Sequence, residues 1–236
     1  MRCKSARRGI FIAIEGPDGA GKSTQAAMLA KRLAREAGLK VTSVREPGGT
    51  PTGERIREVL LDRALGRMCP WTELLLYMAS RTQLVHETIA PALAAGRAVV
   101  ADRFLLSSVV YQGVASKIGP QKVIALARAA FGNCLPDLTV VVDVPAAEGL
   151  SRSARKRKKT AADRVEAKGV SFAEKVRRGF LSAVAGCQLL VVGSDHRKPT
   201  TENRQPVGGR SVVIDGRQPP GEVAEKIWQE VRRVLR

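Results

Sequence analysis

Residues 16–24 have the sequence Gly-Pro-Asp-Gly-Ala-Gly-Lys-Ser-Thr, which matches the pattern G-x-x-x-x-G-K-S/T. The mostly apolar run 10–15 lies immediately before this stretch and predicts a buried strand. Residues 25–33 follow it and carry apolar side chains at helical spacing. A strand, a glycine-rich turn and a helix in this order direct backbone N–H groups and the positive end of a helix towards one point. The stretch therefore predicts a phosphate-binding loop for a nucleoside triphosphate.

Individual residues of the loop are chemically suited to binding phosphate. Its glycines permit backbone conformations that a Cβ would obstruct. Lys22 can reach the β- and γ-phosphates, and the Ser23 hydroxyl is placed to ligate Mg²⁺. The whole loop is a candidate nucleotide-binding segment, comprising Gly16, Pro17, Asp18, Gly19, Ala20, Gly21, Lys22, Ser23 and Thr24.

Length and composition limit the class of protein. The 236 residues, 44% of them hydrophobic, suffice for one substantial α/β domain, and the 4% aromatic content predicts an aliphatic core. No apolar run approaches the roughly 20 residues of a membrane span, and residues 1–8 form a basic tail without the apolar segment of a signal peptide. The four cysteines lack metal-type or redox-type spacing. We expect a cytoplasmic protein without membrane attachment.

The strong positive charge permits two interpretations. Forty Lys and Arg residues against 22 Asp and Glu give a net charge of +18, which suits either nucleic acid or a polyanionic nucleotide. Part of the excess is local, in residues 152–159. The chain has no basic stripe interleaved with aromatic residues, which single-strand binders use for stacking. Nucleotide binding is therefore favoured, and nucleic acid remains the minor alternative.

Strand-like and helix-like segments alternate along the chain. Further strands are predicted over 39–44, 98–101, 136–144 and 210–215, with residues 188–192 as a possible edge strand. Helices are predicted over 54–61, 71–95, 121–131, from 146 into the basic run, 171–184 and 222–234. This alternation predicts a three-layer α/β fold, with a central five-stranded parallel sheet and helices on both faces.

Within this single predicted domain of residues 1–236, two segments lack regular patterning. Residues 152–168 contain the basic run and are expected to form a mobile lid, because like charges repel one another. Residues 193–209 contain Pro, Gly, Asn and charges without periodicity, and we expect a surface insertion. Locally, Thr52 is a candidate cap for the helix over 54–61, and residues 104–112 are expected to be a loop that leads into a helix.

Candidate ligand-binding residues follow the ends of the predicted strands. The Pro- and Gly-rich segment 45–53 follows the second strand, where parallel sheets bind ligands. Asp102 ends the third strand beside the phosphate loop, which suits Mg²⁺ or its water shell. Tyr77 and Arg81 are four residues apart, so a ring and a guanidinium lie side by side on one helix face.

Four further motifs give the chain a resemblance to a known family. They are Arg45-Glu46-Pro47-Gly48-Gly49-Thr50, Leu75-Leu76-Tyr77-x-x-x-Arg81, Asp102-Arg103-Phe104-x-x-Ser107-Ser108-x-x-Tyr111-Gln112 and Asp163-Arg164-x-Glu166. With the phosphate loop, they resemble the thymidylate kinases in order from about Ile10 to Leu235, apart from the insertion. The resemblance implies a nucleoside monophosphate kinase fold, Mg²⁺-dependent transfer of the γ-phosphoryl group of ATP to dTMP, and a homodimer.

The resemblance also implies roles for individual residues. Two arginines, Arg57 and Arg103, would hold the acceptor phosphate, since guanidinium groups suit tetrahedral oxyanions. The remaining predicted contacts with dTMP would come from Tyr77 under the thymine, from Arg81, Ser108 and Gln112 on its polar edge, from Tyr111 against the deoxyribose, and from Asp18 near the 3′-hydroxyl. Ser107 is expected either to join these residues or to cap a helix.

The source of the catalytic cation divides this family. Some thymidylate kinases carry an arginine beside the phosphate-loop aspartate, and others supply arginines from the lid. Here Gly19 follows Asp18, so the resemblance predicts the lid type, with Arg152, Arg155 and Arg157 as candidates. The predicted catalytic set is then Asp18, Lys22, Arg103 and these three arginines, with Ser23 and Asp102 as metal ligands.

Three alternatives to a dTMP kinase stay open at this point. The chain could phosphorylate another pyrimidine monophosphate, it could be a basic P-loop ATPase that binds nucleic acid, or it could bind nucleotide without turnover. The complete set of acceptor-site motifs and the lack of aromatic interleaving argue against the second alternative. The presence of Lys22, Asp102, Arg103 and the lid arginines argues against the third.

Overall fold

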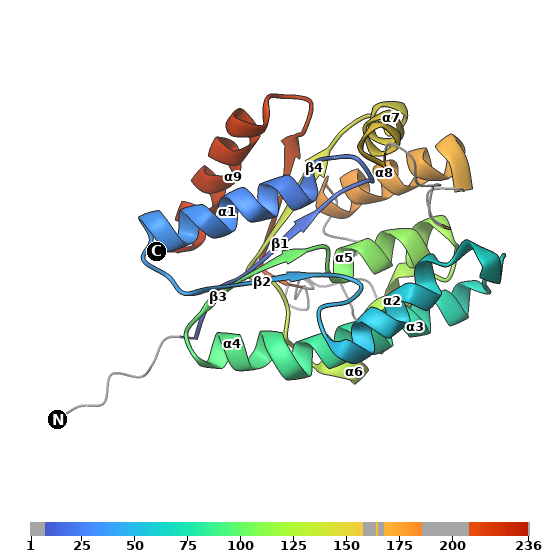
Figure 1. Cartoon of the computed structure of the whole chain (residues 1–236), viewed down its shortest axis with the longest axis horizontal. Coiled ribbons are helices and arrows are strands. Elements are labelled where there is room, and N and C mark those ends of the chain that lie inside the picture. The colour runs from blue at the N-terminus through green and yellow to red at the C-terminus, as the bar shows by residue number, and fades with distance from the viewer. Residues whose placement is uncertain (1–7, 158–163, 165–167, 186–207, 236) are drawn as a thin grey trace, which may run out of the picture.

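Five parallel strands form the centre of the molecule. The computed structural model describes residues 8–157, 164, 168–185 and 208–235, and the sheet order within them is β2-β3-β1-β4-β5. The strands are β1 (Phe11–Glu15), β2 (Val41–Arg45), β3 (Ala98–Asp102), β4 (Leu138–Asp143) and β5 (Arg210–Asp215). Helices lie on both faces of the sheet (Figure 1), so the predicted α/β fold with a five-stranded parallel sheet is confirmed.

The helical elements connect these strands. They are α1 (Lys22–Glu36), α2 (Pro51–Leu61), the short η1 (Arg63–Leu65), α3 (Pro70–Leu84), η2 (Val85–Ile89), α4 (Ala90–Ala94), α5 (Leu105–Ser108), η3 (Val109–Ala115), α6 (Pro120–Phe131), α7 (Ala146–Arg157), α8 (Gly169–Ala185) and α9 (Pro220–Val234). Residues 152–157 of the predicted lid therefore belong to a helix. Most of the rest of that lid, most of the insertion, the tail up to residue 7 and the possible strand 188–192 lie outside the described residues.

The middle strands are apolar on both faces because both faces are covered. Ile12 in the central strand β1 lies opposite Val100 in β3 and Leu138 in β4. Since all strands run in the same direction, their carboxyl ends share one edge of the sheet. The phosphate loop begins at this edge after Glu15, and Asp102 ends β3 there.

Alternate residues of each strand enter two separate hydrophobic cores. In β1, Phe11 and Ala13 pack under α3, α5, α6 and α8, whereas Ile12 and Ile14 pack under α1 and α9. The first core holds the aromatic contacts, including an edge-to-face pair of Phe11 and Phe104 with ring centroids 4.9 Å apart. Each fully buried side chain of this size contributes about 1.5–3 kcal/mol.

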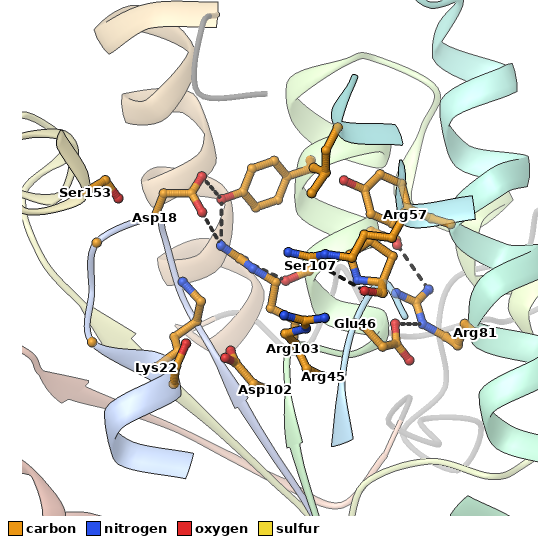
Figure 2. A pocket seen from close by; sticks show the side chains of 18 of the residues that line it. Asp18, Lys22, Arg45, Glu46, Arg57, Arg81, Asp102, Arg103, Ser107 and Ser153 are labelled. Carbon is orange, nitrogen blue, oxygen red and sulfur yellow. Dashed lines mark hydrogen bonds and ion pairs between the residues drawn. The ribbon is translucent and has the colours of Figure 1, made fainter. Parts of the chain in front are cut away.

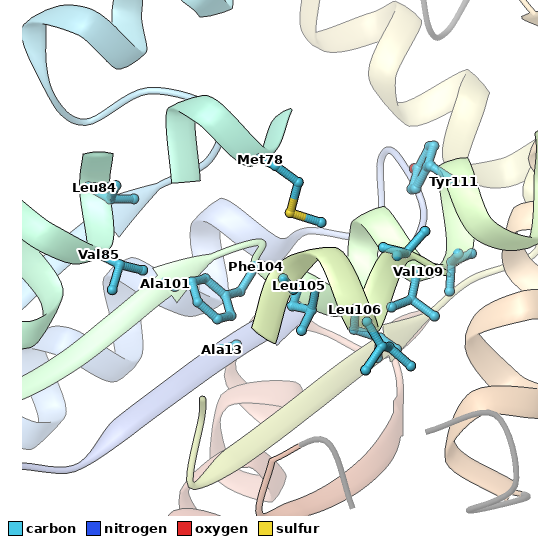
Figure 3. Packing of buried hydrophobic residues seen from close by; sticks show 14 of the residues in the cluster. Ala13, Met78, Leu84, Val85, Ala101, Phe104, Leu105, Leu106, Val109 and Tyr111 are labelled. Carbon is cyan, nitrogen blue, oxygen red and sulfur yellow. The ribbon is translucent and has the colours of Figure 1, made fainter. Parts of the chain in front are cut away.

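The helix that carries the acceptor-site residues is fixed to the sheet by the first core. Figure 3 shows Met78, Leu84 and Val85 gathered with Phe104 above Ala13 of β1 and Ala101 of β3. Arg81 lies on the same helix face as Met78, which its Nη1 contacts, so substitutions in this core would also displace Arg81 and its neighbour Tyr77 on the cavity wall.

Two local predictions differ from the structure. Helix α2 is capped by Thr50 and not by Thr52, because Thr50 has an extended backbone and its Oγ1 accepts from Gly53 N at 2.9 Å, with Pro51 at the first helical position. Residues 104–112, predicted as a loop that leads into a helix, are helical already from Leu105, because the buried Glu15 carboxylate accepts the N–H groups at the start of the helix.

The predicted long helix 71–95 has a widened turn. A π-helical turn, η2, joins α3 to α4 just before Pro91, which supplies no backbone N–H and whose ring crowds the preceding turn. A second π-helical stretch, η3, carries Tyr111 and Gln112. Both widened segments adjoin the helices that line the ligand cavity.

Candidate active site

The phosphate loop packs so tightly that no larger residue can replace Gly16 or Gly19. Gly16 and Gly19 have φ angles of 134° and 74°, which L side chains rarely adopt. A Cβ on Gly16 would lie 2.2 Å from the Val142 carbonyl oxygen, and one on Gly19 would lie 1.9 Å from that of Gly149. The loop is therefore fixed between β4 and the start of α7, with its N–H groups available to an anion.

Lys22 begins α1 and is buried beneath the loop. Its Nζ donates to the Pro17 carbonyl oxygen at 2.6 Å. Burial, with repulsion from Arg103, lowers the pKa of Lys22 to about 8. A polyphosphate in the loop would compensate this buried ammonium, so the site is electrostatically prepared for an anion.

Asp18, Arg103 and Tyr111 form one connected group at the centre of the site. Arg103 has a φ of 72°, and its Nη2 is paired with the Asp18 carboxylate. The Tyr111 hydroxyl donates to Asp18 Oδ2 at 2.9 Å. Although burial opposes ionisation, Arg103 and Lys22 hold the pKa of Asp18 below its usual value. The strained backbone of Arg103 thus directs its guanidinium into the site.

The buried carboxylate of Glu15 positions Arg103 through Ser107. Glu15 at the end of β1 accepts the Phe104 and Ser107 N–H groups at 2.9 and 3.2 Å, and the Ser107 hydroxyl at 2.6 Å. Ser107 Oγ in turn accepts from Arg103 Nη1 at 3.0 Å. Burial raises the pKa of Glu15. Ser107 therefore orients Arg103 and does not cap a helix.

One cavity of about 380 Å³ brings most of the predicted residues together. Figure 2 shows Asp18, Lys22 and Asp102 at one end of it and Glu46 and Arg81 at the other. The predicted donor-side residues on its wall are Asp18, Gly19, Gly21, Lys22, Ser23, Thr24, Asp102 and Arg152. The predicted acceptor-side residues on its wall are Arg57, Tyr77, Arg81, Arg103, Ser108, Tyr111 and Gln112.

Of the three predicted lid arginines, only Arg152 lines the cavity in the described part of the chain. Arg152 lines the cavity, pairs with Glu148 at 2.5 Å and donates to the Gly216 carbonyl oxygen at 2.9 Å. Arg155 is exposed and is not among the residues that line the cavity. The side chain of Arg157 lies outside the described part of the chain.

Arg81 is almost completely buried, and most of its donors are already in use. Its Nε pairs with Glu46 Oε2 at 2.6 Å, and the two side chains are 1% and 3% exposed. Nη1 donates to Ser108 Oγ at 3.0 Å and contacts Met78 Sδ, and Nη2 donates to the Phe104 carbonyl oxygen at 3.0 Å. One N–H on Nη2 is left for a ligand. Despite Arg81, burial raises the pKa of Glu46 to about 7.

Gln112 and Arg57 are also held by protein groups. The Gln112 amide nitrogen donates to Glu73 Oε1 at 2.7 Å. Arg57 Nη1 donates to the Pro47 carbonyl oxygen at 2.9 Å. Glu73 additionally pairs with Arg164, which is the described residue of the Asp163-Arg164-x-Glu166 motif.

Three buried acids of this site were given no role by the sequence analysis: Glu15, Glu46 and Glu73. Each left a weak signal, namely an acid that ends an apolar strand, an acid inside a quoted motif, and an acid one turn before Tyr77 on an apolar helix. An isolated Asp or Glu in such a position is more often solvated, so its burial was not predictable.

The donor side has ligands of the type that Mg²⁺ prefers. The Ser23 hydroxyl and the Asp102 carboxylate line the same cavity as Lys22. Mg²⁺ usually takes one or two carboxylates, substrate phosphates and several waters, not a cage of side chains. Among the described residues no group of three or more His, Cys, Asp or Glu could form such a cage, and Ser23 with Asp102 fits a nucleotide-bound ion.

A phosphate-binding loop that faces a second, cation-lined wall in one cavity defines a P-loop phosphotransferase with two phosphate-bearing substrates. No helix in the described ranges is long and apolar enough to cross a membrane. The comparisons with known proteins specify the class further.

The family model for thymidylate kinase matches residues 14–205. The chain is 41% identical over 224 residues to the thymidylate kinase of Deinococcus radiodurans, covering 95% of this chain and 97% of that protein. It is 46% identical over 198 residues to that of Pseudomonas fluorescens strain Pf0-1, covering 84% and 92%. The crystal structure of thymidylate kinase from Ehrlichia chaffeensis has the same fold, with a TM-score of 0.70 at 24% identity over 95% of this chain and 99% of that one.

The chain therefore belongs to the thymidylate kinase family, and its activity is the phosphorylation of dTMP to dTDP, the reaction of an ATP-binding transferase in dTTP synthesis.

Proposed function

We propose that the 380 Å³ cavity is the active site in which Mg²⁺-bound ATP passes its γ-phosphoryl group to dTMP. The observation that carries this proposal is that one cavity contains both Lys22 and Ser23 of the phosphate loop and the wall made by Arg57, Tyr77 and Arg81. Phosphoryl transfer depends mainly on holding two phosphates in line and neutralising their charge. The arrangement fits that requirement.

On the donor side, the loop N–H groups and Lys22 would hold the β- and γ-phosphates of ATP. Ser23 and Asp102 would hold Mg²⁺, which supplies charge neutralisation on the phosphates when bound. On the acceptor side, Arg57 and Arg103 would hold the dTMP phosphate. Arg103 already contacts the Asp18 carboxylate and the Gly16 carbonyl oxygen, so little side-chain ordering remains for substrate binding.

The nucleoside part of dTMP would lie against Tyr77, Tyr111 and Gln112. The free N–H of Arg81 would reach a base carbonyl, and Ser108, whose hydroxyl accepts from Arg81, supports that orientation. Asp18 would face the sugar 3′-hydroxyl. A panel of nucleoside monophosphates in a coupled assay tests this assignment, since efficient turnover of AMP or GMP would contradict a site shaped for a pyrimidine.

We further propose that the lid, residues 152–168, supplies the catalytic cation. Gly19 leaves no arginine beside Asp18, and Arg152 already lines the cavity. Replacing Arg152, Arg155 and Arg157 by Ala should lower kcat by about 10³-fold or more, as for a supplied arginine finger. The affinity for dTMP should change little, because Arg57 and Arg103 hold that phosphate.

Arg57→Ala is the matched control for the triple lid variant, and it should weaken dTMP binding measured by calorimetry. If the triple variant keeps a near-normal kcat, the basic run is a solvated surface and the catalytic cation lies elsewhere.

We also propose a cytoplasmic homodimer, with residues 1–236 forming one domain. Exposed apolar side chains on the adjacent helices α2 and α3, namely Val59, Trp71 and Leu75, support the dimer. Leu75→Glu, measured by light scattering, should shift the mass towards the monomer. An unchanged dimer would place the interface elsewhere.

A further inference from the structure

Glu73, in the first turn of α3, is a buried carboxylate that contacts no predicted substrate atom directly. Its side chain is 2% exposed, its Oε1 accepts the Gln112 amide nitrogen at 2.7 Å, and its Oε2 pairs with Arg164 Nη1 at 2.7 Å. Lys168 Nζ lies 3.3 Å from the same Oε2. Although burial opposes ionisation, these three partners hold the pKa of Glu73 below its usual value. Glu73 is therefore an ionised acceptor.

An ionised carboxylate fixes the orientation of the amide that it contacts. Glu73 can only accept hydrogen bonds, so the Gln112 NH₂ group must face it and the Gln112 carbonyl oxygen must face elsewhere. Gln112 is buried and lines the ligand cavity. The reversed amide would set an oxygen against the carboxylate and leave two buried acceptors without a donor, which is costly. The group that Gln112 offers to a ligand is thus an acceptor.

This orientation distinguishes pyrimidine bases. Thymine and uracil present an N–H donor at N3, whereas cytosine presents an acceptor there. We propose that Glu73 is a positioning residue that fixes the Gln112 amide and thereby selects monophosphates whose base carries N–H at N3 over dCMP. The proposal rests on the proposed contact between Gln112 and the base. Arg164 and Lys168 both favour the ionised Glu73 carboxylate, and Arg164 still pairs with it when Lys168 is replaced.

The test compares kcat/KM for dTMP, dUMP and dCMP in the full chain and in Glu73→Gln. A glutamine at 73 can donate or accept, so the Gln112 amide can take either orientation. The dCMP-to-dTMP ratio should rise at least about tenfold, as expected when a mismatched polar contact is relieved. The dUMP-to-dTMP ratio should stay unchanged, since both bases carry N–H at N3.

Lys168→Met is the matched control, because it removes one ion partner of Glu73 and leaves the Gln112 contact in place. Its dCMP-to-dTMP ratio should stay within about twofold of the starting chain, well below the tenfold effect above. If Glu73→Gln alone does not fold, the double variant Glu73→Gln with Arg164→Met also removes the buried cation, whose side chain is 8% exposed, and should show the same raised ratio.

A merely structural role for Glu73 predicts a parallel loss of activity with both nucleotides and an unchanged ratio. That result would overturn the proposal, as would equal turnover of dTMP and dCMP by the unsubstituted chain. Failure of the unsubstituted chain to phosphorylate any pyrimidine monophosphate would instead contradict the proposed function, so the two failures are distinguishable. In the Gln112→Leu background, Glu73→Gln should leave the ratio unaltered, because the amide that it orients is gone.

Discussion

The donor end and the acceptor end of the cavity are built in different ways. At the donor end, consecutive residues of one loop present backbone N–H groups, and the ammonium of Lys22 donates to the Pro17 carbonyl oxygen at 2.6 Å, with the Asp18 and Asp102 carboxylates nearby. At the acceptor end, buried carboxylates from separate segments hold the polar groups, as Glu46 holds Arg81 and Glu73 holds Gln112. In the described part of the chain, Lys22 at the donor end therefore has no hydrogen-bonded carboxylate, whereas Arg81 and Gln112 at the acceptor end each have one.

This difference has an energetic consequence. A buried charge that has no hydrogen-bonded counter-ion lowers the free energy of unfolding, and binding of an oppositely charged ligand offsets this cost. Substitutions at the donor end should therefore affect function more than folding. A buried pair of opposite charges costs little while intact but leaves an uncompensated ion when one partner is removed. Substitutions at the acceptor end should therefore affect folding as well as binding.

The largest expected effect is on stability at the acceptor end. Arg81→Met removes the cation next to Glu46, and the free energy of unfolding should fall by about 3–5 kcal/mol. Arg152→Met is the control, since its ion pair with Glu148 is similarly short but 30% and 36% exposed. Its loss should cost only about 0–1 kcal/mol. Urea unfolding monitored by circular dichroism measures both, and equal losses would remove the distinction between the two ends.

The pH dependence of the Arg81→Met effect has a definite sign. The folded-state pKa of Glu46 is raised to about 7, so its protonated form is favoured by folding and stability falls as pH rises towards that value. Without Arg81 the pKa rises further, so the variant continues to lose stability above pH 7. Its deficit relative to the starting chain should widen from about pH 7 to pH 9, and a constant deficit would mean that Arg81 does not affect the ionisation of Glu46.

The next effect is on catalysis at the donor end. Lys22→Met removes a cation aimed at the phosphates, and kcat should fall by about 10²–10³-fold, or roughly 2.7–4 kcal/mol of barrier. The free energy of unfolding should not fall, because the lowered pKa of Lys22, about 8, means that its charged form destabilises the folded state below that pH. Steady-state kinetics and urea unfolding measured together check this. A clear loss of stability would show that Lys22 is a structural cation.

The smallest effect concerns ATP affinity and pH. In the protein without ATP, Lys22 has a pKa of about 8, so its side chain is charged below that pH and increasingly neutral above it. Binding to phosphate then requires proton uptake, so the affinity for ATP should be roughly tenfold weaker at about pH 9 than at about pH 7.5. Calorimetry in buffers of different ionisation enthalpy would detect the proton directly. Lys22→Met should show neither the pH dependence nor the proton uptake.

The two ends also differ in how far they could be predicted. The phosphate loop lies within nine consecutive residues, because backbone N–H groups, glycine conformations and the start of a helix are local properties. The strand pattern predicted the parallel sheet, since both faces of the middle strands are covered and their sequences are apolar throughout. The family resemblance also assigned Asp18, Arg103 and Tyr111 to one site, but it did not predict their contacts with one another.

The tertiary structure alone decided how the polar groups of the site are paired. Glu15 is 92 residues from Ser107, Glu46 is 35 from Arg81, and Glu73 is 39 from Gln112. No helical or strand period connects such positions, and a single acid in an apolar segment does not reveal which cation or amide it will meet. The sequence by itself determined the phosphate loop and the sheet because these depend on neighbouring residues. The fold decided which donors are occupied and which remain for a ligand, because that depends on burial, and burial arises only when distant segments pack together.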